Sequence, residues 1–199
     1  LPDAAGGDIV APEDAEPGDV PRAMSEPGWT QKAPLPFEVT ENAAAGVGKG
    51  IYVVGGFQGL SLPNTVVRYD VETDTWVEVA EFPKQGYHHM NLVSADGLIF
   101  SVAGHNGVTF TPSDAVFAYD PAADTWSPRA VAPRARGGAA AAFVGGRIWV
   151  VGGVTDQGIA SDLVAYDPET DTWAADFPAM ADTREHLAAC SLDGRMHVF

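Results

Sequence analysis

Tryptophan recurs in this chain at almost constant intervals. Trp29, Trp76, Trp126 and Trp173 are separated by 47, 50 and 47 residues. A fixed period of about 50 residues indicates one folding unit that is used repeatedly along the chain. The repeat therefore constrains the architecture more than any other feature of the sequence.

The residues before the last three tryptophans repeat as well. Each of these tryptophans is preceded by a Tyr-Asp pair, and further upstream by an apolar run that ends in small residues. Paired glycines permit a close approach of backbones, and large aromatic rings fill the space between neighbouring units. We interpret the following residues as scaffold: Gly55, Gly56, Tyr69, Trp76, Gly104, Tyr119, Trp126, Gly152, Gly153, Tyr166 and Trp173.

Each repeat reads as four short strands separated by turn residues. In the clearest copy, residues 138–144 and 147–151 flank a Gly-Gly turn, and a loop then leads to residues 163–166 and 172–173. Alternating short apolar runs and turn signals predict an all-β fold. Four antiparallel strands in a repeat of this length predict a blade of a β-propeller.

The combination of Gly-Gly, Tyr-Asp and Asp-Thr-Trp resembles the kelch repeat. The resemblance covers residues 29–199 and implies a partial ring with blades at about 37–78, 86–128 and 135–175 and a partial blade at 183–199. It also implies that the segment around Trp29 is a lone outer strand and that further blades follow, so that the chain is a fragment. In the second copy Ala103 replaces the first glycine, which predicts a locally different turn there.

Residues 1–28 differ in composition from the repeats. Twenty-one of them are Ala, Gly, Pro, Asp or Glu, and Arg22 is the one basic residue. Such a segment buries too little apolar surface to offset its ordering entropy, so we expect a disordered acidic linker. A linker of this kind is typical of tethered extracellular, periplasmic or cell-envelope proteins, and we expect a bacterial, exported protein, although a cytoplasmic location stays open.

The net charge of −16 argues against several partners. Nucleic-acid binding requires a basic face, and docking on an anionic membrane requires basic residues too. No transmembrane segment is recognisable in the sequence, so we expect no direct membrane insertion. Cys190 is the single cysteine, which excludes a disulfide within the chain.

Candidate binding residues follow from the register of the repeats. Positions twelve and ten residues before each second strand should share one side of the backbone near the mouth of the central channel. Arginine offers paired hydrogen bonds to carboxylates, so arginines there are candidate anchors for an acidic ligand, unless they pair with acidic residues of neighbouring blades. The candidates are Tyr87, His89, Arg134, Arg136, Arg184 and His186.

Metal and cofactor binding are not expected. Adjacent strand residues such as His88 and His89 should point to opposite faces, and His186 lies two repeats away from His89. The pair Tyr87-His88 resembles a strand of galactose oxidase, a copper enzyme with a kelch-like fold. No cysteine lies in a neighbouring inner strand to form the Cys–Tyr crosslink that this enzyme requires.

The favoured function is a binding module for a protein or a glycan on the loop face. No nucleophile elbow, phosphate-binding loop or nucleotide fingerprint is present. The alternative is a sugar-acting kelch enzyme, similar to sialic acid epimerase or galactose oxidase, whose catalytic residues cannot be assigned to positions in this chain. An assembly role, in which exposed blade edges matter, also stays open.

Overall fold

Each repeat folds into one antiparallel sheet of four short strands. The structure, a computed structural model, describes residues 30–199, and contacts group Ala33–Phe199 into one unit. The expected acidic linker and Trp29 lie outside the described residues. Residues 30–32 form no strand. The described residues contain no helix long and apolar enough to cross a membrane.

Three complete blades follow one another. Blade one contains β1 (Ala43–Val47), β2 (Gly50–Val54), β3 (Val66–Asp70) and β4 (Thr75–Val79). Blade two contains β6 (Asn91–Ala95), β7 (Leu98–Val102), β10 (Val116–Asp120) and β11 (Thr125–Pro128). Blade three contains β12 (Ala140–Val144), β13 (Arg147–Val151), β16 (Leu163–Asp167) and β17 (Thr172–Ala174). In every blade the strands pair in the order of the sequence.

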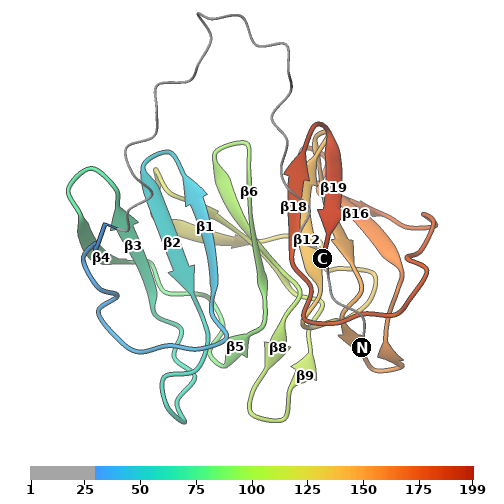
Figure 1. Cartoon of the computed structure of the whole chain (residues 1–199), viewed down its shortest axis with the longest axis horizontal. Coiled ribbons are helices and arrows are strands. Elements are labelled where there is room, and N and C mark those ends of the chain that lie inside the picture. The colour runs from blue at the N-terminus through green and yellow to red at the C-terminus, as the bar shows by residue number, and fades with distance from the viewer. Residues whose placement is uncertain (1–29) are drawn as a thin grey trace, which may run out of the picture. The chain divides into compact units, whose positions relative to one another are not determined.

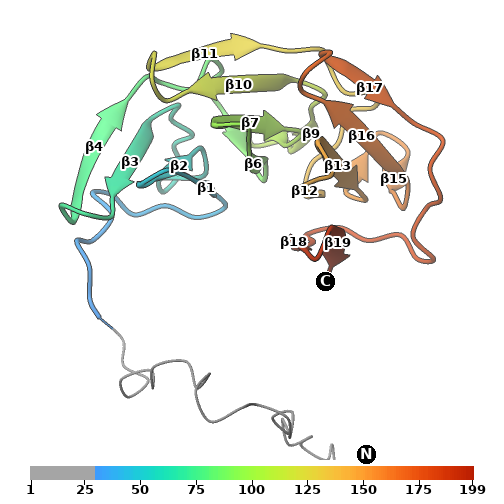
Figure 2. The same ribbon diagram turned by 90° about the horizontal axis from the view of Figure 1, so that it is seen from above.

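Shorter strands complete the fold. The hairpin of β18 (Ala189–Leu192) and β19 (Arg195–Val198) begins a fourth blade. The strands β5 (Tyr87–His88), β8 (His105–Asn106) and β9 (Thr111–Pro112) form a small sheet. A second one consists of β14 (Val154–Thr155) and β15 (Gly158–Ile159). Within Ala33–Phe199 the blades fan around a common centre, with the first strand of each blade innermost and the fourth outermost (Figures 1 and 2). The fold is therefore the expected β-propeller, present as a partial ring.

The apolar core lies between adjacent blades. Val54 and Val66 of blade one pack with Phe82, Met90 and Phe117 on the side of blade two. A larger cluster joins blades two and three and includes Phe100 and Tyr166. Because blade two is covered on both faces, its middle strands β7 and β10 are apolar at nearly every position rather than at alternate ones.

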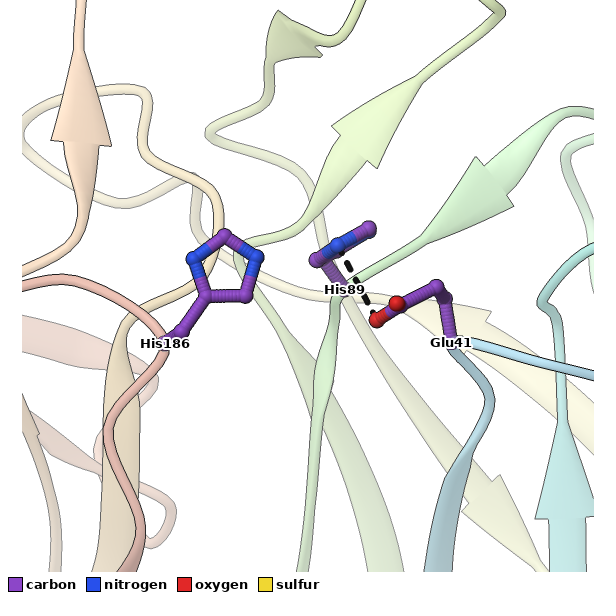
Figure 3. Close-up of side chains that lie close together, drawn as sticks. All are labelled: Glu41, His89 and His186. Carbon is purple, nitrogen blue, oxygen red and sulfur yellow. Dashed lines mark ion pairs between the residues drawn. The ribbon is translucent and has the colours of Figure 1, made fainter.

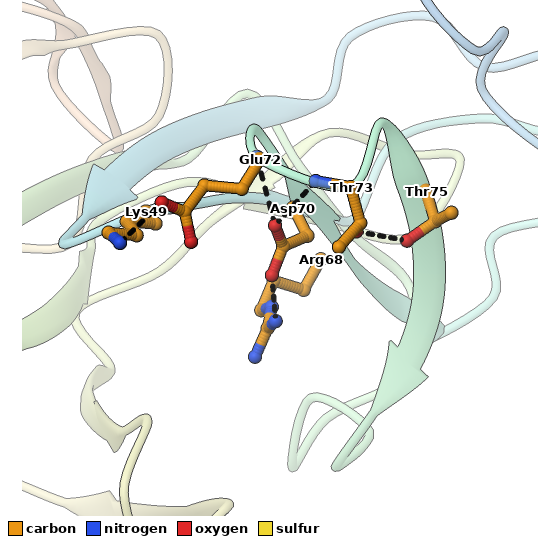
Figure 4. A network of polar contacts seen from close by, with 6 residues as sticks. All are labelled: Lys49, Arg68, Asp70, Glu72, Thr73 and Thr75. Atoms are coloured by element: carbon orange, nitrogen blue, oxygen red, sulfur yellow. Dashed lines mark hydrogen bonds and ion pairs between the residues drawn. The ribbon is translucent and has the colours of Figure 1, made fainter.

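The turn between the third and fourth strands is fixed by the aspartate of the Tyr-Asp pair. In blade one, Asp70 Oδ1 accepts hydrogen bonds from the backbone N–H groups of Glu72 and Thr73, at 3.0 and 3.2 Å (Figure 4). Its Oδ2 accepts a hydrogen bond from Arg68 Nη2 at 2.7 Å. The same turn recurs at Asp120 and Asp167, so this residue repeats because it closes a turn.

Ala103 does not produce a different turn. Its φ of 60° matches those of Gly55 and Gly152, which are 69° and 66°. The expectation was wrong because the surrounding sheet imposes the left-handed backbone on alanine as well. In blade two the loop that follows forms β8 and β9 and pairs with β5, whereas the equivalent contacts of blades one and three are single bridges, Thr40–Phe57 and Gly137–Val154.

Candidate functional site

Four equivalent residues are linked by backbone hydrogen bonds into an arc, called here the backbone ring, around the centre of the blades. Glu41, His89, Gly138 and His186 stand just before the first strands of successive sheets, and all have positive φ, between 49° and 61°. The N–H of His89 donates to the Glu41 carbonyl at 3.2 Å, that of Gly138 to His89 at 3.2 Å, and that of His186 to Gly138 at 2.7 Å. At each of these four residues, the left-handed backbone conformation ends the extended segment that precedes it.

The ring gathers three side chains that can act as ligands. One ligand atom from each of Glu41, His89 and His186 lies within 4.8 Å of the other two. Figure 3 shows the three side chains turned toward one another from three separate segments. His89 Nε2 lies 3.0 Å from Glu41 Oε2, and the rings of His89 and His186 have centroids 4.9 Å apart in an edge-to-face arrangement.

Histidine and phenylalanine side chains pack against this group. His88 and His105 are buried, and the ring of Phe110 meets the rings of His88, His89 and His105 edge-to-face at 4.7, 5.4 and 5.5 Å. Gly137 provides the space for His105, because a Cβ at this position would lie 2.5 Å from its ring atoms. The loop residue Phe110 therefore limits the access of water to three histidines.

Burial affects the charge of His89 and His105. It lowers the pKa of His89, although the nearby Glu41 carboxylate acts in the opposite direction. Burial also lowers the pKa of His105, and the neighbouring histidines His89 and His88 add to this effect. Both imidazoles are therefore biased toward the neutral form, which is the form that ligates metals.

Comparison with known proteins agrees with the propeller fold. Residues 22–199 match the family described as the KLHDC2/KLHL20/DRC7 Kelch-repeats domain. The chain belongs to the kelch-repeat family. Kelch-like protein 35 of Mus musculus is 33% identical over 172 residues, covering 85% of this chain and 29% of that protein. Kelch-like protein terF of Aspergillus terreus is 32% identical over 161 residues, covering 71% of this chain and 35% of that protein.

A solved structure supports the fold independently. The structure titled "Structure of YjhT" superimposes with a TM-score of 0.72 at 19% identity, covering 84% of this chain and 60% of that one. At this identity the likeness concerns the fold alone. The kelch chain spans less than a third of the length of the mouse protein, so its relatives contain much that these residues do not.

The kelch register places Tyr87 and Arg136 inside the protein. The Tyr87 hydroxyl lies 2.6 Å from Ser113 Oγ in a buried contact. The Arg136 side chain is 1% exposed, donates to the carbonyl of Gly152 at 3.0 Å and pairs with Asp162 Oδ2 at 2.7 Å. This is a correction to the expected shared orientation at the channel mouth: Arg136 pairs with an aspartate, and that aspartate belongs to its own blade.

The other two arginines of the kelch loops are exposed. Arg134 lines a pocket with Thr155, Gln157 and Asp162. Arg184 is half exposed and lies 4.0 Å from Asp182. Its N–H donates to the Ala160 carbonyl, so the backbone of this position is fixed while its side chain faces solvent.

The two premises against a metal site do not hold in the kelch fold. His88 and His89 do not point to opposite faces, because β5 ends at His88 and His89 has a φ of 49°. Their Nδ1 atoms lie within hydrogen-bonding distance. The two-repeat separation of His89 and His186 is also short in space, because the ring of backbone bonds brings every such position to the axis. Glu41 stands ten residues before Ile51, in the same register as His89 and His186. It was not among the candidate residues expected from the sequence, although this offset was the signal that could have found it.

Proposed function

We propose that these kelch repeats form a protein-binding module, and that the partner docks on the loop face. The loop face is defined here by the loops between the second and third strands of each blade, 55–65, 103–115 and 152–162, and by the between-blade segments beside them. Pairing between β5 and β8 and the bridge between Gly137 and Val154 show that both kinds of loop meet. Loops on a rigid scaffold are common sites of recognition.

The observation that carries the proposal is a set of exposed apolar side chains on three consecutive loops. Leu60 of blade one is 99% exposed, Val108 of blade two is 70% exposed, and Ile159 of blade three is 47% exposed. Phe110 is exposed to the same extent as Ile159. Apolar side chains grouped on one face favour a surface that becomes buried against another protein.

Charged side chains near these apolar residues can orient a bound partner protein. Arg134 and Arg184 are exposed beside the loop of blade three, and a guanidinium can bind a carboxylate through two hydrogen bonds. We therefore propose acidic groups on the partner opposite these two arginines. Arg136 contributes instead to the stability of the loop, through its bonds to Gly152 and Asp162.

The exposed aliphatic groups favour a protein over a glycan. Sugar hydroxyls require hydrogen-bonding partners when they are buried, and Leu60, Val108 and Ile159 offer none in their side chains. Two of the polar residues expected at the mouth for a sugar-acting enzyme, Tyr87 and Arg136, are bonded in the interior instead. Both alternatives stay predictions with less support.

Site-specific photo-crosslinking tests the proposal. A photoreactive phenylalanine analogue is placed at Leu60, Val108 or Ile159 in the full chain, and at Val71 as a control. Val71 is also an exposed apolar residue, but it lies in the turn between β3 and β4, at the opposite ends of the strands. Crosslinked proteins from the source cells are identified by mass spectrometry, and the candidate is then purified for binding measurements.

The expected result is one shared crosslinked protein from the three loop positions and not from Val71. Replacing Leu60, Val108 and Ile159 with serine together should weaken its binding at least about tenfold, since each loses apolar burial. The matched control is Val71→Ser. Equal crosslinking from Val71, or unchanged affinity of the triple variant, would contradict the proposal.

A further inference from the structure

Three potential metal ligands converge where the inner ends of the blades meet. Glu41, His89 and His186 come from segments that precede three different sheets, and their ligand atoms lie within 4.8 Å of one another (Figure 3). The backbone ring holds these positions together, because His89 N–H bonds to Glu41 and Gly138 links His89 to His186. The convergence is therefore a property of the fold and not of flexible side chains alone.

Hydrogen bonding sets the orientation of His89. The carbonyl oxygen of Gly107 can only accept, so His88 Nε2, 3.0 Å away, carries a hydrogen. His88 Nδ1 and His89 Nδ1 lie within hydrogen-bonding distance, and the arrangement in which His88 Nδ1 accepts places the hydrogen of the His89 ring on Nδ1. This leaves the lone pair of His89 Nε2 facing Glu41 Oε2 at 3.0 Å. Two electron-rich atoms at this distance require a proton or a cation between them.

In His186, as in His89, one ring nitrogen bonds to a residue outside the group of three. Its Nδ1 lies 3.0 Å from Glu185 Oε2, so a hydrogen on Nδ1 donates to this carboxylate and leaves Nε2 as a lone pair. A metal-binding histidine characteristically donates its other N–H to a carboxylate or another acceptor, which fixes the tautomer and the ring. Both histidines of this group have such a partner.

The space around the three side chains suits a bound ion. Gly138 occupies the fourth position of the backbone ring, and a Cβ there would lie 3.5 to 3.7 Å from atoms of His186. A pocket lined by His89, Asn91, Gly138 and His186 opens beside the group. A fourth ligand such as water therefore has room to reach an ion held by the three side chains.

We propose that Glu41, His89 and His186 bind one divalent transition-metal ion, with zinc as the representative case. Two imidazoles and one carboxylate form a donor set that zinc accepts with water as fourth ligand. Tetrahedral coordination at bond lengths of about 2.0–2.2 Å places ligand atoms about 3.3 Å apart. The Glu41–His89 pair is close to this spacing already, and the ligand atom of the exposed His186 lies within 4.8 Å of both partners.

An ion pair between Glu41 and His89 alone does not account for the third member. Such a pair needs no other imidazole, yet His186 approaches His89 with its own Nδ1 already bonded to Glu185. The large negative charge of the chain also attracts cations to the protein. The nearest acidic groups, Glu41 and Glu185, provide local negative charge for a divalent ion.

Zinc titration of metal-stripped protein tests the proposal. The full chain, without any affinity tag, is dialysed against chelator and titrated with zinc in competition with a chromogenic chelator. Cobalt is added in a parallel experiment, because its visible absorption reports tetrahedral coordination. We expect about one tight site per chain, and a loss of affinity of at least about tenfold in His186→Ala and in Glu41→Gln.

Two variants are matched controls. His197→Ala removes a histidine of β19, and Cys190→Ser removes the exposed thiol; both should bind zinc as the unmodified chain does. Thermal unfolding without metal verifies that each variant is folded, and zinc should raise the melting temperature of the unmodified chain but not of His186→Ala. Absence of a stoichiometric site, unchanged binding in both ligand variants, or loss of binding in either control would overturn the proposal.

Discussion

The indole N–H of Trp126 donates a hydrogen bond to the carbonyl oxygen of Ala80 at 3.0 Å. Trp126 belongs to the outer strand of blade two, and Ala80 follows the outer strand of blade one. The N–H of Ala80 in turn donates to Asp124 Oδ1 at 2.8 Å, and Tyr119 donates its hydroxyl hydrogen to the same oxygen at 2.7 Å. One residue of the preceding blade is thus held through both of its backbone groups.

The same clamp is repeated in the other two blades. Trp76 and Trp173 donate to Ala33 and Ala130, whose N–H groups donate to Asp74 and Asp171. The Tyr, Asp and Trp of each repeat therefore act together in joining a blade to the segment before it. This explains why the three residue types recur at fixed spacing.

Asp124→Ala should lower the free energy of unfolding by about 1–2 kcal/mol. The substitution removes the acceptor of both the Ala80 N–H and the buried Tyr119 hydroxyl, although water can reach the exposed carboxylate position. Urea denaturation followed by tryptophan fluorescence measures the change. Glu78→Gln, an exposed carboxylate on β4, is the control and should change stability little; equal effects would argue against the clamp.

Acid should weaken the protein through the same aspartates. The pKa of Asp124 is lowered mainly by the Ala80 N–H, and the pKa of Asp171 mainly by the Tyr166 hydroxyl. A folded-state pKa below the unfolded value of 3.8 gives stability that is present above pH 3.8 and is lost as the pH falls through the folded-state pKa. The double variant Asp124→Asn and Asp171→Asn should therefore show less loss of stability in urea titrations from pH 6 to pH 3. An unaltered pH dependence would contradict this prediction.

The arginines Arg136 and Arg184 should differ in their effect on stability. Arg136→Ala removes a buried guanidinium that holds Gly152 and Asp162, and we expect a loss of about 2–3 kcal/mol. Arg184→Ala removes an exposed side chain and should cost less than about 0.5 kcal/mol. Denaturation midpoints compare the two variants directly. A similar small change in both would mean that the bonds of Arg136 do not stabilise the fold.

Gly137→Ala should disturb the histidine cluster. Gly137 has an ordinary backbone conformation, so the substitution adds no left-handed strain, but its Cβ would lie 2.5 Å from the ring of His105. Overpacking of this kind costs about 1–3 kcal/mol. Gly46→Ala is the matched control, because the nearest atom to its Cβ would be 3.8 Å away. The histidine NMR signals should shift in the first variant and not in the second.

Sequence periodicity was sufficient for the blades because each blade is built from local contacts. The strands of one blade are neighbours in sequence, and the turn at Asp70 is closed by residues two and three positions later. Such short-range features leave a direct mark on the residue pattern. The kelch resemblance therefore predicted the all-β class and the propeller blades, as the structure and the family match confirm.

The candidate site required more than the pattern. Register alone placed Glu41, His89, Gly138 and His186 at equivalent positions. Regular strand geometry also assigned Tyr87 and Arg136 to the channel mouth, and both side chains are buried instead. The positive φ at each position could not be inferred for Glu41, His89 and His186, since it is a conformation that residues with a Cβ rarely adopt. Likewise, nothing in the sequence distinguished buried Arg136 from exposed Arg184.

The sequence by itself determined the repeat, the four strands of each blade and the positions at which the blades are clamped together. Those features arise from periodic burial and from turns that close within a few residues. Only the tertiary structure decided that Glu41, His89 and His186 meet, because their proximity depends on the rotation from one blade to the next and on the backbone bonds between them.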